Sequence, residues 1–307
     1  MPRIDSAFGV VIPTKNRPEG MRRLLHSIQK QQVWPGQIVI VDSGDVPLDA
    51  IVSEFDCFRI HYVKHKSSSL PQKRNIGINH LGFEIQIVAF FDDDVQLCPH
   101  AIDSVMAFWL SCPKDTAGIA CNNVSHRRTP ITFLEKVFMV GSDHVGIILP
   151  SGFQSKICSL NRDYSVEWLI GGATFWKRSI FDEFIFDEWF CGYSFCEDVE
   201  FSYRVSKKYK LFAIKDAVFL HDTASVQSAS EYHLGKIQVM NRIYFVRKHR
   251  EFLLPLCYWS CLGLFLKNVF LGVARCKKRC LLRGWGVFVG ILQSFYYLEQ
   301  IGVEVKK

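Results

Sequence analysis

Short apolar runs alternate with amphipathic segments along the first 110 residues of the chain. The runs at 8–12, 38–41, 59–63 and 85–91 are rich in Val, Ile and Phe, which is typical of strands in the interior of a parallel sheet. Residues 21–28 between the first two runs carry Met and Leu at helical spacing. This alternation predicts an α/β fold with a mostly parallel central sheet and helices on both faces.

Polar side chains follow several of these runs at the point where each predicted strand ends. Thr14 to Arg17 follow the first run, Asp42 follows the second, and Asp92 to Asp94 follow the fourth. Parallel α/β sheets bind ligands beyond the carboxyl ends of their strands. The sequence therefore predicts a ligand site at this edge.

The segment FFDDDV at 90–95 places three carboxylates in a row. Like charges this close raise each other's pKa, so a positive partner is expected. Mg²⁺ commonly takes one or two protein carboxylates together with substrate phosphates. In an extended segment Asp92 and Asp94 would face one pocket, and Asp93 would turn aside. A solvated acidic loop, or an N-cap cluster for the next helix, is the alternative.

Five further polar positions have both a functional and a structural interpretation. Lys73 and Arg74, on a loop entering a helix, suit a phosphate cradle or a solvated helix face. Asp42 fits either an acceptor of a hydrogen bond from a ring N–H of a nucleotide base or an ordinary turn aspartate. His221 follows an apolar run and fits either a metal ligand or a structural histidine at a strand end. Asp198 suits a general base or a carboxylate at a helix start.

Composition and charge divide the chain into two parts. The sequence has 307 residues, 49% of them hydrophobic and 22% charged, which indicates a globular chain with a large core. Residues 226–307 carry 13 Lys or Arg and only 4 Asp or Glu, whereas residues 1–225 carry 24 and 26. We therefore expect domains at 1–225 and 226–307. The basic charge lies among apolar residues, which disfavours nucleic acid as a partner.

The basic C-terminal region contains two apolar segments. The first, from Phe252 to Leu266, has about 15 residues and is shorter than the roughly 20 of a spanning helix, and Lys267 with Asn268 interrupts its extension. The pattern favours helices lying in a membrane interface that contains anionic headgroups. A helical subdomain packed on the core, a homo-oligomer contact and a true span are the alternatives.

The cysteines and the N-terminus indicate a cytoplasmic chain. The 11 cysteines include no CxxC pair, and the N-terminal residues lack a signal-peptide layout, so reduced thiols are expected. Cys276 and Cys280 are expected to be ordinary helix residues, with metal binding or lipidation as the alternative.

Seven segments occur together in an order that resembles one enzyme family. They are VVIPTKNRP, IVIVDSG, KRNIG, FFDDDV, GGATFWKR, FDEWFCGYSFCEDVEFSYRV and FLHD, between Val10 and about Asp222. The set resembles family 2 glycosyltransferases of the bacterial surface-polysaccharide type, which have the GT-A nucleotide-sugar-binding fold. The resemblance implies that Asp92 and Asp94 form the DXD motif and that Asp198 is the catalytic base, with Glu197 as its neighbour.

The residues and the resemblance together give a full set of expected site residues. Nucleotide-sugar binding is expected of Pro13, Thr14, Asn16, Asp42, Lys73, Arg74, Asp92 and Asp93. The acceptor or sugar pocket is expected to involve Trp168, Gly171 and Gly172. Mg²⁺ or Mn²⁺ is expected on Asp94, Asp92 and His221.

The resemblance implies an inverting, metal-dependent glycosyltransferase. It would move a sugar from a UDP- or dTDP-linked donor to a glycan or lipid-linked glycan acceptor in cell-surface polysaccharide synthesis, at the inner face of the cell membrane. A nucleotidyltransferase is the alternative enzyme, although no Gly-rich triphosphate loop lies near the first strand. A membrane-bound scaffold that binds sugar-nucleotides without catalysis is the other alternative.

Overall fold

The chain folds as two compact units. The computed structural model describes residues 2–66, 69–192, 194–222 and 230–304. The first unit comprises residues 1–128 and 157–225, and the second comprises residues 129–156 and 226–307. The change of unit after residue 225 coincides with the boundary expected from charge. Segment 129–156, which we expected in the first domain, is grouped instead with the C-terminal helices.

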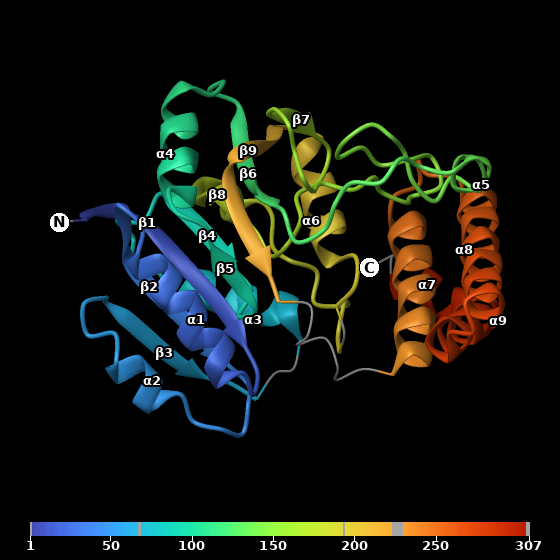
Figure 1. The fold of residues 1–307 in the computed structure, drawn as a ribbon, viewed down its shortest axis with the longest axis horizontal. Coiled ribbons are helices and arrows are strands. Elements are labelled where there is room, and N and C mark those ends of the chain that lie inside the picture. Colours follow the sequence, from blue (N-terminus) through green and yellow to red (C-terminus); the bar gives the residue numbers. More distant parts are fainter. Residues whose placement is uncertain (1, 67–68, 193, 223–229, 305–307) are drawn as a thin grey trace. The chain divides into compact units, whose positions relative to one another are not determined.

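The first unit contains one sheet and the helices that flank it (Figure 1). Its elements are β1 (Arg3–Thr14), α1 (Pro18–Gln29), β2 (Val33–Asp42), α2 (Asp49–Ser53), β3 (Ile60–Lys64), α3 (Leu70–Asn79), β4 (Ile87–Phe91), β5 (Val95–Leu97), α4 (Ala101–Ser111), β6 (Thr116–Asn123), β7 (Tyr164–Val166), β8 (Ala173–Lys177), η1 (Arg178–Asp182), α6 (Glu197–Ser206) and β9 (Lys210–His221).

The sheet has a parallel half and a mixed half. Its strand order is β3-β2-β1-β4-β8-β6-β9-β5, and β7 pairs with β9. The four strands from β3 to β4 are parallel. β8 is antiparallel to both β4 and β6, while β6 is parallel to β9. The predicted α/β class is confirmed.

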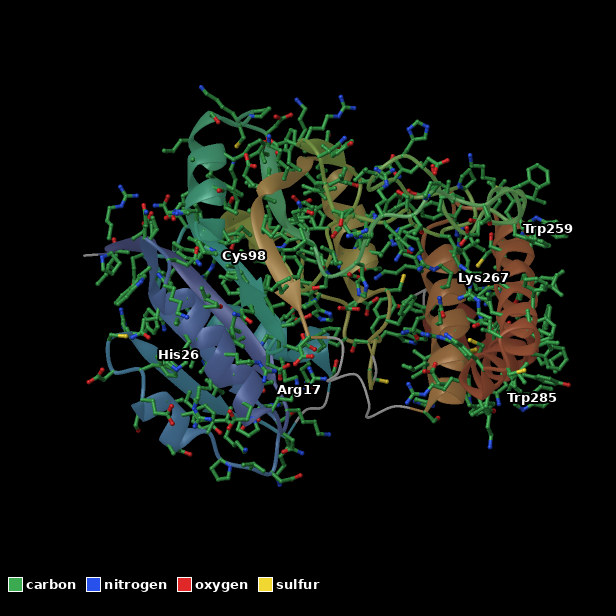
Figure 2. The ribbon with its side chains drawn as sticks, in the orientation of Figure 1. Arg17, His26, Cys98, Trp259, Lys267 and Trp285 are labelled. Atoms are coloured by element: carbon green, nitrogen blue, oxygen red, sulfur yellow. The ribbon has the colours of Figure 1, made fainter. Side chains whose placement is uncertain are left out.

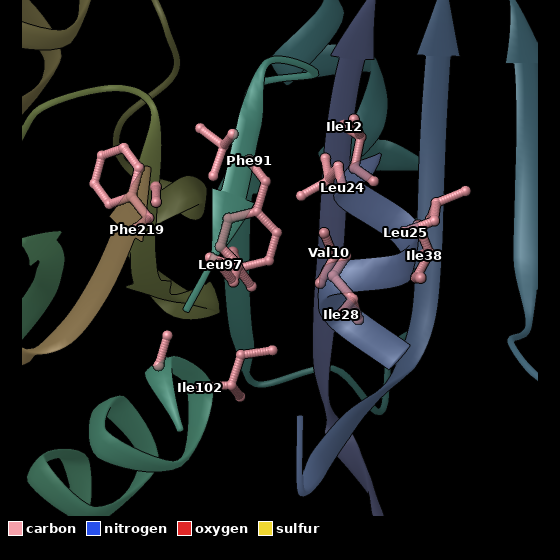
Figure 3. Close-up of a cluster of buried hydrophobic side chains, with 14 of the residues drawn as sticks. Val10, Ile12, Leu24, Leu25, Ile28, Ile38, Phe91, Leu97, Ile102 and Phe219 are labelled. Carbon is pink, nitrogen blue, oxygen red and sulfur yellow. The ribbon is translucent and has the colours of Figure 1, made fainter. Parts of the chain in front are cut away.

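The core lies where α1 covers the sheet (Figure 3). Val10 and Ile12 of β1 are fully buried against Leu24 and Ile28 of α1. Pro18 lies at the start of α1, where its missing N–H costs no hydrogen bond. The predicted helical stripe and the first strand therefore meet in one core.

The second unit consists of helices and a long connecting segment. Its helices are α5 (Phe133–Val137), α7 (Glu231–Lys248), α8 (Leu254–Ala274) and α9 (Lys278–Glu304). Buried Arg242 of α7 donates to the Gly152 carbonyl and to Gln154 Oε1, at 2.5 Å each. These bonds tie segment 129–156 to the helices.

One expectation about local structure is wrong. Lys267 and Asn268 do not interrupt α8, because both polar groups find partners. Lys267 Nζ lies 2.7 Å from Glu135 Oε1, and Asn268 Nδ2 donates to the Leu264 carbonyl one turn back.

The central aromatic packing provides a test of the core. Phe175 of β8 is fully buried, stacks on Phe8 and meets Phe91 edge to face, each with a ring-centroid distance of 5.5 Å. We expect Phe175→Ala to lower the free energy of unfolding by about 3–5 kcal/mol, because it leaves a cavity in the sheet core. Urea denaturation followed by circular dichroism measures the change.

Phe83→Ala is the matched control, because Phe83 is 102% exposed. That change should stay within about 0.5 kcal/mol. Equal losses from both substitutions would contradict the assigned core.

Candidate active site

The predicted strand-end residues lie at the ends of their strands in the first unit. Thr14 ends β1, Asp42 ends β2 and His221 ends β9, while Asp92 directly follows β4. Strands β1, β2 and β4 are parallel, so their carboxyl ends share one edge of the sheet. The structure therefore gathers these polar groups at the edge predicted for a ligand.

The three consecutive acids form a turn and pair with two different arginines. Asp92 accepts a contact from Arg74 Nη2 at 3.2 Å. Asp93 and Asp94 share Arg17 Nη1, at 2.8 and 2.6 Å. The expected extended conformation of this segment is wrong, because the Val95 N–H donates to the Asp92 carbonyl and closes a turn. Asp93 shares a counterion with Asp94 and does not turn aside.

Arg17 lies in the strand-end group expected at the ligand edge but was given no specific role, and it is the shared counterion of two acids. Figure 2 shows it at the start of α1. Thr14 Oγ1 adds a 2.7 Å hydrogen bond to Asp93, and His221 Nε2 lies 3.0 Å from Asp94 Oδ1. The signal for Arg17 was its position just after the first strand, at the same edge as the acid turn.

Arg74 joins the acid turn to the start of α6. Its guanidinium is buried and reaches Asp92 Oδ1, Glu197 Oε1 and the Gly171 carbonyl, each at 3.2 Å. We expected Lys73 and Arg74 on a loop entering a helix, but both lie within α3 and both are buried. Lys73 Nζ donates to the Thr14 carbonyl at 3.1 Å, and burial lowers its pKa.

Glu197 and Asp198 occupy the first turn of α6, as the sequence predicted. Asp198 Oδ1 accepts the Val199 N–H at 2.8 Å, and its Oδ2 accepts the Gly171 N–H at 3.1 Å. Arg74, Gly171 and Asp198 line one small pocket together with Thr174, Trp176 and neighbouring apolar residues. Arg74 also contacts Asp92 and Glu197, so its guanidinium connects the acid turn and the start of α6 to this pocket.

Burial and mutual repulsion raise the pKa of the two acids that contact Arg74. Desolvation raises the pKa of Glu197 to about 8; the charge of Asp198 adds to this, and Arg74 opposes it. Desolvation also raises the pKa of Asp92 to about 6, again against Arg74. The hydrogen bond to Asp94 raises the pKa of His221. The site thus holds its negative charge at a cost that a bound cation would lower.

The remaining expected residues are buried or bonded to other parts of the protein. Asp42 is fully buried and accepts from Tyr62 Oη at 2.7 Å and Lys64 Nζ at 2.8 Å. Asn16 has φ of 55° and accepts the Asp45 N–H at 2.6 Å. Trp168 is buried at 5% exposure. Two expected residues remain: Pro13 lies within β1, and Gly172 accepts the Asp92 N–H.

The donor set fits a divalent cation that a substrate completes. Asp92 and Asp94 offer carboxylate oxygens and His221 offers a ring nitrogen, which suits Mg²⁺ or Mn²⁺. Within the described ranges, no group of three or more His, Cys, Asp or Glu side chains is already arranged to hold a metal. Hard cations at such sites take further ligands from phosphates and water, so a complete protein cage is not required.

A comparison with known protein families finds a match. Residues 9–185 match the family described as Glycosyl transferase family 2. A comparison with curated protein sequences finds no match.

Solved structures show the same fold at low sequence identity. Mannosyltransferase PcManGT from Pyrobaculum calidifontis, in complex with GDP-Man and Mn²⁺, is 13% identical with a TM-score of 0.55, covering 98% of this chain and 83% of that one. S. aureus TarS is 14% identical with a TM-score of 0.52, covering 88% of this chain and 44% of TarS. S. aureus TarS 1-349 in complex with UDP-GlcNAc is 13% identical with a TM-score of 0.51, covering 94% and 92%.

These neighbours establish the fold, and the family match establishes the class of protein. The sheet belongs to a GT-A fold. Because the match at residues 9–185 covers more than half of the sequence, the chain belongs to glycosyl transferase family 2.

Proposed function

We propose that this protein is an inverting, metal-dependent hexosyl- or deoxyhexosyltransferase. It uses a UDP- or dTDP-linked donor and a hydroxyl of a glycan or lipid-linked glycan acceptor in cell-surface polysaccharide synthesis. The observation that carries the proposal is the Arg74 bridge between Asp92 and Glu197, which joins two separate acidic motifs through one buried guanidinium. The proposed location is the cytoplasmic side of the cell membrane.

Asp198 is positioned to act as the general base of a single displacement. The acceptor hydroxyl oxygen attacks the anomeric carbon while its proton passes to the Asp198 carboxylate, and the bond from that carbon to the diphosphate oxygen breaks. The N–H groups of Gly171 and Val199 fix the orientation of this carboxylate. One displacement inverts the anomeric configuration.

The acid turn and its cations are suited to the diphosphate. A divalent cation held by Asp94 and Asp92, with His221, would supply positive charge to the leaving diphosphate. Arg74 is enclosed by protein partners, so it acts here by positioning Asp92 and Glu197. Arg17 lies at the surface of the same turn, where its guanidinium can pass from the acids to a phosphate.

The base assignment has a direct test. We expect Asp198→Asn to lower the rate of sugar transfer by about 10²–10⁴-fold, because the amide cannot accept the proton. Nucleotide release from a panel of UDP- and dTDP-sugars, with and without Mn²⁺ or Mg²⁺, measures the rate. Donor binding, followed by calorimetry, should remain near that of the unaltered protein.

Asp216→Asn is the matched control, because its side chain is 72% exposed and lies on the strand β9. Wild-type turnover in Asp198→Asn would refute its role as base. Release of pyrophosphate from a nucleoside triphosphate and a sugar 1-phosphate would instead identify a nucleotidyltransferase.

The acid turn has a test that does not depend on turnover. Arg17 and a metal ion compete for Asp94, so Arg17→Ala should tighten Mn²⁺ binding without nucleotide by about tenfold, the value of roughly one charge-assisted contact. Calorimetric titration with Mn²⁺ measures the affinity.

Arg22→Ala serves as the control, because Arg22 pairs with Glu19 and Glu54 away from the acid turn. Unchanged or weaker Mn²⁺ binding in Arg17→Ala would show that the guanidinium and the cation do not share this site.

A further inference from the structure

The helix α8 packs with its large apolar side chains outward. The residues that it buries are small or polar, namely Cys257, Ser260, Cys261, Gly263, Asn268 and Gly272. Its exposed side chains recur every three or four residues along one stripe and are 40–70% exposed: Trp259, Leu262, Leu266, Phe270 and Val273. A helix of a water-soluble domain buries its large apolar side chains. The reverse order is typical of a helix whose outer face contacts lipid.

The helix α9 also packs with small residues inward and large apolar side chains outward. Gly286 and Gly290 face α7 so closely that an added Cβ would lie 1.9 Å from the Tyr232 carbonyl oxygen and 2.9 Å from that of Lys236. Spacing small residues by four allows this backbone contact and is frequent in membrane helices. The outward side chains of α9 are 41–55% exposed at Leu281, Leu282, Trp285, Leu292 and Phe295.

The two exposed stripes form one surface. Tyr258 stacks on Phe295 at 4.9 Å and Phe265 meets Phe288 at 5.6 Å, so α8 and α9 run antiparallel along a common seam. From the helical positions of these contacts, both stripes lie on the same side of the seam. We call this surface, made of the ten exposed residues named for α8 and α9, the α8–α9 apolar face. Figure 2 labels Trp259 and Trp285 on it.

A basic turn adjoins the α8–α9 apolar face. Residues 275–283, which comprise the connection between the two helices and the start of α9, carry five Lys or Arg and no acidic residue. Arg275, Lys277, Lys278 and Arg279 are all exposed. An apolar surface beside this exposed positive charge is complementary to a bilayer with anionic headgroups.

The arrangement favours attachment in the plane of the bilayer over a span. Helix α8 is long and apolar enough to cross a membrane by length and composition, which is weak evidence by itself. However, α9 stays packed on both α8 and α7, and α7 carries Lys236 and Arg242. A crossing hairpin would also carry the basic turn through hydrocarbon, which is costly.

We propose that the α8–α9 apolar face binds an anionic lipid bilayer, with both helices in the membrane plane and the basic turn among the headgroups. This inference deepens the membrane location within the proposed function, but it does not depend on the transfer chemistry. It assigns the attachment to one surface of the second unit.

Vesicle sedimentation of the full chain tests this surface. The unaltered protein should pellet with vesicles of phosphatidylcholine and phosphatidylglycerol at equal amounts, and more weakly with phosphatidylcholine alone. The double variant Phe270→Asp/Trp285→Asp should lower the partition coefficient at least about tenfold, since each change removes a large apolar side chain from the bound face. Phe83→Asp, at a fully exposed position of the first unit, should pellet like the unaltered protein.

Several outcomes would overturn the proposal. They are a full chain that stays in the supernatant with anionic vesicles, a double variant that pellets normally, and a chain in native membranes that resists extraction at pH 11, as a spanning helix would. A sedimentation-velocity shift from dimer to monomer in the double variant, without loss of vesicle binding, would assign the face to a second copy of the chain.

Donor turnover in the same preparations separates this proposal from the proposed function. Loss of vesicle binding with normal nucleotide release supports the surface assignment. Normal vesicle binding without nucleotide release from any donor also supports the surface and counts against the transfer chemistry.

Discussion

A buried guanidinium holds the first unit's two acidic segments together. Arg74 reaches Asp92 and Glu197 at 3.2 Å each, and its charge lies 5.3 Å from the centre of the Phe186 ring. Removing one member of such a buried network leaves an uncompensated charge, which commonly costs about 3–5 kcal/mol. The acid turn after β4 and the first turn of α6 are more than 100 residues apart in sequence, and this contact fixes their separation. The geometry of the pocket therefore depends on the integrity of the aromatic core beneath it.

The proposed function requires the charged groups of the site to exchange partners when a donor binds. Desolvation raises the pKa of Asp92 and Glu197, while Arg17 and His221 balance Asp93 and Asp94. A cation that arrives with a diphosphate would stabilise the charged form of these carboxylates. Arg17 would then be displaced toward the phosphates, so no charge needs to be left unpaired. The pairing of the acids in the ligand-free protein therefore suits the proposed departure of the diphosphate.

The second unit follows a different packing rule from the first. In the first unit, Val10, Leu24 and Phe175 are buried as expected for a water-soluble domain. In the second, glycine and cysteine face inward on α8 while Trp259 and Phe270 face outward. The polar interruption at Lys267 does not end the helix, because Glu135 from the connecting segment compensates its charge. Segment 129–156 therefore makes a continuous α8 possible, although it lies far from that helix in the sequence.

The sequence by itself determined the α/β alternation, the strand ends that carry Thr14, Asp42 and Asp92, and the start of α6 at Glu197. Each of these follows from local periodicity and from where apolar runs stop. Only the tertiary structure decided which cation meets which acid: Arg17 takes Asp93 and Asp94, and Arg74 is buried between Asp92 and Glu197. It also decided that the large side chains of α8 face outward. Hydrophobic periodicity records that a helix has two faces, but which face is covered depends on neighbours that the chain brings together only when it folds.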